Sequence, residues 1–106
     1  WEEGPKVSEA KYNHTTSDDA KALQDWFERI TECQRILSEL QRTLRYDRLG
    51  VNEVVLRLDA VLQQKRVVAP EQFVPILDRI AKNESILNMA RERAASLSDT
   101  FKAMPK

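Results

Sequence analysis

The chain has 106 residues, of which 42% are hydrophobic and 32% charged, and its 17 basic residues balance its 17 acidic ones. This length supports one folded domain, and the zero net charge excludes a general attraction to nucleic acid or to an anionic membrane. Apolar runs no longer than three residues exclude a membrane-spanning helix and a signal-peptide core within this sequence.

A single cysteine, Cys33, rules out an intrachain disulfide and fits a reducing compartment. Only two glycines are present, while Ala, Leu, Glu, Gln, Arg and Lys are abundant. Because these residues favour helix over sheet, we expect an all-α protein that is soluble and intracellular.

Residues 1–17 contain Gly4, Pro5 and several turn formers but only scattered apolar residues. We expect a flexible tail or linker there and place the folded domain at residues 18–106. The acidic and aromatic character of residues 1–4, together with Tyr12, leaves open a second interpretation, in which the tail folds back and masks part of the domain.

A long amphipathic helix is predicted over residues 18–45, because Ser17 and the two aspartates after it are typical of a helix start. Apolar residues then recur at steps of three and four. They are Leu23, Trp26, Ile30, Cys33, Leu37, Leu40 and Leu44, with Phe27 and Ile36 widening the stripe. A helix of about 28 residues is ~42 Å long, more than this domain needs. Its N-terminal half, with Trp26 and Phe27, is therefore expected to project or to lie against the tail.

Three further helical segments follow. Val51, Val54, Val55, Leu58, Val61 and Leu62 predict a helix over residues 51–64. Pro70 and Pro75 divide the next segment into short helices near 70–74 and 75–82, with Phe73, Leu77 and Ile80 facing inward. Asn83 is then expected to cap a last helix over 84–103, whose inner stripe is Ile86, Met89, Ala90, Ala94, Leu97, Phe101 and Met104.

Four to five helices with short connections predict a compact bundle of two helical hairpins. The hairpin tips, residues 45–50 and 81–85, are expected to lie side by side at one end of the bundle. A surface built from two separate loops would form there.

The sequence offers little for catalysis. His14 is the only histidine and lies in the tail, while Cys33 lies on the apolar stripe, where a cysteine behaves as a small hydrophobe. No metal-ligand spacing, phosphate-binding glycine loop or nucleophile elbow occurs. We therefore predict no enzymatic activity, no cofactor and no metal.

Residues 33–62, CQRILSELQRTLRYDRLGVNEVVLRLDAVL, resemble the first hairpin of the integrase-binding domain of lens epithelium-derived growth factor and the hepatoma-derived growth factor-related proteins. The features that carry this resemblance are Gln34-Arg35-Ile36, the run from Glu39 to Leu44, the corner at Asp47, Val51-Asn52 and Leu58-Asp59. Weaker similarity continues through Leu77, Ile80 and Phe101-Lys102, so that about residues 33–104 are covered.

The resemblance implies a five-helix bundle of two hairpins, similar to the N-terminal domains of transcription elongation factors. It also implies a nuclear, chromatin-associated adaptor, because members of this family carry a PWWP module that engages nucleosomes. In the family, disordered acidic and aromatic segments of nuclear proteins, and retroviral integrase in vertebrates, bind at the hairpin tips. A corner aspartate accepts backbone hydrogen bonds from these ligands, and Asp47 is the corresponding residue.

The second tip departs from the family, which has a basic and aromatic cluster with a Phe and a Val there. This chain keeps two basic residues, Arg79 and Lys82, but Asn83, Glu84 and Ser85 are all polar. The resemblance therefore implies a divergent member with its own partners. The predicted partner-binding residues are Tyr46, Asp47, Arg48, Leu49, Arg79, Lys82 and Asn83.

Two other functions stay open at this point. One is a scaffold of the transcription-elongation type, and the other is homodimerisation through the exposed half of the first helix, although a monomer is expected. Direct nucleic-acid binding would need a basic stripe. The arginines at 42, 45 and 48 instead alternate with the acids Glu39, Asp47 and Glu53.

Overall fold

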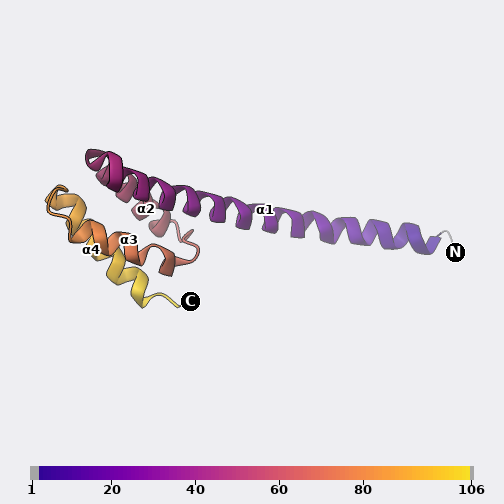
Figure 1. The fold of residues 1–106 in the computed structure, drawn as a ribbon. Helices are drawn as coiled ribbons and strands as arrows, with labels where there is room; N and C mark the ends of the chain where they lie inside the picture. The colour runs from indigo at the N-terminus through magenta and orange to yellow at the C-terminus, as the bar shows by residue number, and fades with distance from the viewer. Residues whose placement is uncertain (1–2, 106) are drawn as a thin grey trace.

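A computed structural model describes the backbone of residues 3–105 and the side chains of residues 18–105. Residues 3–105 contain no strand and form helices in the order α1 (Glu3–Tyr46), η1 (Arg48–Gly50), α2 (Val51–Gln63), η2 (Pro70–Gln72), α3 (Val74–Ala81) and α4 (Asn88–Ala103), where η marks a 3₁₀ helix (Figure 1). The predicted all-α bundle with a long first helix is confirmed. In this bundle α1 packs against α2, and α3 packs against α4.

Helix α1 is longer than predicted, because it begins at Glu3 and not at residue 18. Ser17 therefore lies inside the helix and does not start it. Pro5 occupies the first turn, where no backbone N–H is needed, and no later proline or glycine interrupts the helix before its end. The side chains of residues 1–17 lie outside the described part of the chain, so their expected role as a tail or a mask stays a prediction.

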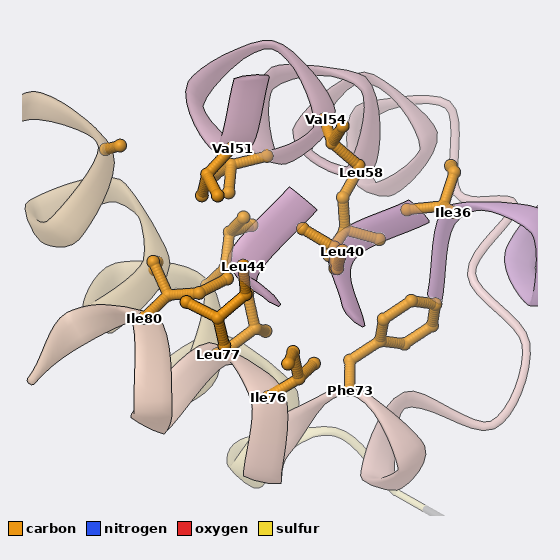
Figure 2. Close-up of a cluster of buried hydrophobic side chains, with 14 of the residues drawn as sticks. Ile36, Leu40, Leu44, Val51, Val54, Leu58, Phe73, Ile76, Leu77 and Ile80 are labelled. Atoms are coloured by element: carbon orange, nitrogen blue, oxygen red, sulfur yellow. The ribbon is translucent and has the colours of Figure 1, made fainter. Parts of the chain in front are cut away.

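The C-terminal half of α1 supplies one wall of the core. Cys33, Ile36, Leu40 and Leu44 are buried against residues of α2 and α3 (Figure 2). Further towards the N-terminus, Leu23, Trp26 and Phe27 are 67%, 47% and 69% exposed. The expected projection of this half is confirmed, and Figure 1 shows α1 extending far past the other helices.

Helices α2 and α3 follow the predicted patterns closely. Every predicted apolar position of α2 is buried except Leu62, which is half-buried. Phe73, Leu77 and Ile80 face the core as expected, and Ile76 joins them. Pro70 and Pro75 each stand in the first turn of a helix, η2 and α3, where a missing N–H costs no hydrogen bond.

Helix α4 corrects two predictions, because it begins at Asn88 and not at residue 84, and because Asn83 does not cap it. The Asn83 Oδ1 accepts hydrogen bonds from the Ser85 backbone N–H at 2.9 Å and from the Ser85 hydroxyl at 2.6 Å. These bonds close a turn, and the helix starts only after the extended residue Leu87. Met89 is 62% exposed instead of buried, because the inner stripe of α4 runs through its neighbour Ala90.

A polar link joins α3 to α4 beside the core. The Ser98 hydroxyl donates to Oδ1 of Asp78, and the Lys102 ammonium lies 3.5 Å from Oδ2. The hydrogen bond from Ser98, aided by the charge of Lys102, holds the pKa of the Asp78 carboxyl below its usual value of 3.8. The ionised carboxylate is therefore the form that the folded protein favours.

Stability should depend on pH through Asp78. Since its pKa is lower when folded than when unfolded, the stabilisation is present above pH 3.8 and is lost as the pH falls through the folded value. We expect Asp78→Asn to lower the melting temperature by a few degrees at pH 7, and the gap to the wild type to close below pH 3.8. Thermal melts across this range test the prediction, with the exposed Asp99→Asn on α4 as control. A gap of constant size at all pH values would contradict it.

Candidate functional site

The two hairpin tips meet at one end of the bundle, as the sequence predicted. The guanidinium of Arg48, in η1, donates a hydrogen bond to the hydroxyl of Ser85 at 3.0 Å. Ser85 in turn donates to Asn83, so one chain of hydrogen bonds runs from the first tip into the second. The link depends on a hydroxyl at position 85, because only a group that both accepts and donates can stand between an arginine and an amide oxygen.

An open groove of about 590 Å³ lies beside this junction, between the end of α1 and α3. Its lining residues are Gln41, Leu44, Arg45, Arg48, Ile76, Arg79 and Asn83. Leu44 and Ile76 are its buried apolar members. Three of the seven are arginines and none is acidic. Guanidinium groups stay charged at any physiological pH and bind carboxylates through paired N–H groups, so the groove is suited to an acidic ligand.

Asp47 stands at the corner, between α1 and η1. Its backbone N–H donates to the carbonyl of Thr43 at 2.9 Å, and its carbonyl accepts from the N–H of Gly50 at 2.9 Å. Its side chain makes no capping hydrogen bond to η1. The carboxylate is exposed and lies over Gly50, where an added Cβ would come within 2.8 Å of Oδ2. The backbone of Asp47 closes the corner, while its carboxylate stays accessible to a ligand.

Two large side chains flank Asp47 and face solvent. Tyr46, the last residue of α1, is 77% exposed, and Leu49 is 82% exposed. The Arg45 guanidinium lies 5.7 Å from the centre of the Tyr46 ring, within the range of a cation–π contact. Exposed aromatic and aliphatic side chains beside a charged groove are typical of a peptide-binding surface.

The structure brings together some of the predicted site residues and not others. Arg48, Arg79 and Asn83 line the groove. The other predicted residues are exposed but are not part of its lining: Tyr46, Asp47 and Leu49 at the first tip, and Lys82 after the end of α3. Sequence reasoning missed Gln41, Leu44, Arg45, Ile76 and Ser85. The spacing of positions 41 and 45 gives a signal for the groove, because a step of four places both residues on one face of α1. Arg48 lies beyond the corner at Asp47, so this spacing does not reach it. Ile76 and Ser85 carry no such signal.

No cluster of three His, Cys, Asp or Glu side chains that could hold a metal ion occurs within the described residues. Cys33 is buried, its Sγ accepts a hydrogen bond from the N–H of Val68 at 3.3 Å, and burial raises the pKa of its thiol. This is the small apolar role expected for Cys33.

None of the helices described is both long and apolar enough to cross a membrane.

Comparison of the chain with protein-family models, curated proteins and solved structures gives no match.

Proposed function

We propose that this domain is a chromatin-associated adaptor that binds disordered, acidic segments of nuclear proteins at its joined hairpin tips. The observation that carries the proposal is the groove with three arginines and no acid. Tyr46 and Leu49, which follow its lining residues Arg45 and Arg48 in the chain, are both exposed. The resemblance of residues 33–62 to the integrase-binding domain supports the same class of partner, and a nuclear, chromatin-bound setting is part of the proposal.

The three arginines would act first, because they attract acidic side chains before contact and speed the encounter. Arg45, Arg48 and Arg79 come from α1, η1 and α3, so an acidic segment that crosses the groove would bridge both hairpins. The Asp47 carboxylate accepts backbone N–H groups of the ligand, and Tyr46 and Leu49 supply apolar contacts. Since the ligand orders only on binding, the affinity should be modest.

The polar second tip distinguishes the partners of this domain. Asn83 and Ser85 are engaged with each other and with Arg48. They therefore offer a ligand polar contacts in place of an apolar pair. We infer that the partner's apolar residue is bound by the first tip, near Tyr46 and Leu49.

The decisive experiment separates a binding role of Asp47 from a structural one. Because its carboxylate makes no capping bond, Asp47→Asn should leave the melting temperature nearly unchanged. It should weaken the binding of a fluorescent peptide, with an acidic run followed by Phe, by about tenfold, the effect of losing one hydrogen bond to a charged acceptor. Fluorescence anisotropy measures this, and the same peptide with serines in place of the acids is the control.

Two outcomes would refute the proposal that the domain binds an acidic peptide with the help of Asp47. In one, Asp47→Asn lowers the melting temperature by many degrees while the affinity per folded molecule stays the same, which would make Asp47 a structural residue. In the other, the serine peptide binds as well as the acidic one. A short DNA duplex that displaces the acidic peptide at physiological salt would point to nucleic acid as the ligand instead.

A further inference from the structure

One face of α1 has no partner within the described molecule. Figure 1 shows α2, α3 and α4 on the same side of α1, against the stripe of Cys33, Ile36, Leu40 and Leu44. A second stripe runs at steps of three and four along the opposite side. Its members are Gln24, Glu28, Thr31, Arg35, Ser38 and Arg42, and all are exposed. Arg45 follows at the end of this stripe, where the outer face meets the groove at the hairpin tips.

Charge on this outer face is ordered along the helix. Glu28, with Glu32 one turn later, lies in the projecting half, whereas Arg42 and Arg45 lie near the tip. The ion pairs among the described side chains are Arg57–Glu39, Arg66–Asp25 and Lys102–Asp78, and they use none of these four residues. Glu28 and Arg42 lie about 21 Å apart on one straight helix, so they cannot meet within one molecule.

Exposed apolar side chains lie at both ends of the same segment. Leu23 and Phe27 are exposed in the projecting half, and Tyr46 and Leu49 are exposed at the tip. In an antiparallel pair with Thr31 opposite Arg42, Phe27 of one chain stands at the same height along the pair as Tyr46 of the other.

We propose that a second copy of this chain covers the outer face of α1 in an antiparallel pair. In the register just described, Arg42 of each copy lies between Glu28 and Glu32 of the other, and Arg45 lies beside Glu28. Ser38, a small residue, lies near the twofold axis and leaves room for the Arg35 side chain of the other copy. Each contact occurs twice, so the assembly closes as a symmetric dimer.

A recess at the edge of this face contains both of the glutamates that would meet Arg42. A hollow of about 440 Å³ is lined by Phe27, Glu28, Thr31, Glu32, Arg35 and Arg66. Both of its glutamates are exposed, and Thr31 lies between them. Two arginines share the recess, and one of them, Arg66, is paired with Asp25. A further guanidinium that enters there can contact both glutamates and the Phe27 ring. The dimer does not depend on the peptide-binding function, although it would use Arg45 and Tyr46 and therefore compete with a peptide for them.

A charge-swap experiment tests the dimer directly. Glu28→Arg with Glu32→Arg places like charges opposite Arg42, and Arg42→Glu places like charges opposite the two glutamates. We expect each variant alone to raise the dimer dissociation constant by about tenfold or more, because like charges would face each other on both sides of the twofold axis. The two variants mixed in equal amounts should recover dimers, since opposite charges then face each other at both contacts.

Sedimentation equilibrium of the whole chain at low salt provides the measurement, and Glu92→Arg, on the exposed side of α4, is the matched control for charge. Circular dichroism confirms that each variant stays helical, as expected for exposed positions. A wild-type chain that stays monomeric at high concentration, or a mixture that does not recover dimers, would overturn the proposal. Association that grows past dimers would also overturn it, because the proposed pairing closes.

A distance measurement separates antiparallel from parallel pairing. Spin labels at Gln24, in a Cys33→Ala background, should lie about 40 Å apart in the antiparallel dimer, because each is far from the twofold axis. A parallel pair would place the same labels about 10 Å apart, at the spacing of packed helices. A short distance would therefore reject the proposed arrangement even if the chain dimerises.

Discussion

Replacing Leu40 with alanine is expected to lower the free energy of unfolding by roughly 3 kcal/mol, and the melting temperature by roughly 10 to 20 °C. Leu40 is 0% exposed, and Figure 2 shows it in the middle of the cluster that joins α1, α2 and α3. The truncation removes apolar contacts with three helices and leaves a cavity that the helices cannot close without losing their other contacts.

Urea unfolding measures this effect as a lower midpoint with an unchanged dependence on urea, if the variant keeps the same fold. Leu56→Ala is the matched control, because the same atoms are removed from α2 at a position that is 41% exposed. We expect Leu56→Ala to lower the free energy of unfolding by less than half as much as Leu40→Ala does. Similar losses for the two variants would show that Leu40 does not hold the three helices together.

The second large effect is expected on peptide binding in the groove beside the joined hairpin tips. Reversing two charges with Arg48→Glu and Arg79→Glu should weaken binding of the acidic peptide by about 100-fold or more, because two attractions become repulsions. Both residues line the groove but belong to different hairpins. Arg48→Glu also removes the hydrogen bond to Ser85, so the single variant Arg79→Glu is measured beside the double one.

Anisotropy titrations at two salt concentrations test this prediction. Wild-type affinity should fall as salt rises, and the double variant should lose this dependence because its groove no longer attracts the ligand. Lys21→Glu with Lys65→Glu changes the net charge equally at exposed positions of α1 and of the turn after α2, away from the tips. If that control weakens binding as much as the groove variant does, the attraction comes from overall charge and the groove is not the site.

The helices of this protein follow from its sequence wherever burial imposes a period. The stripe from Cys33 to Leu44 and the stripe of α2 predict their helices within a residue or two, because one face of each must meet the core. The sequence did not predict the helix ends at which no side chain has to be buried. The start of α1 carries no buried stripe, and the start of α4 depends on whether the Asn83 side chain caps a helix or closes a turn.

Some features of the candidate site were likewise predictable from the sequence and others were not. The sequence alone determined the all-α class, the two hairpins and the corner at Asp47, because apolar spacing and turn residues act over a few neighbouring positions. Only the tertiary structure decided that Arg45 and Ile76 share a groove with Arg79 while Lys82 lies outside it, and that Ser85 joins the two tips. These relations depend on how α3 packs across the end of α1. That packing is set by contacts between residues far apart in the chain, which no local pattern encodes.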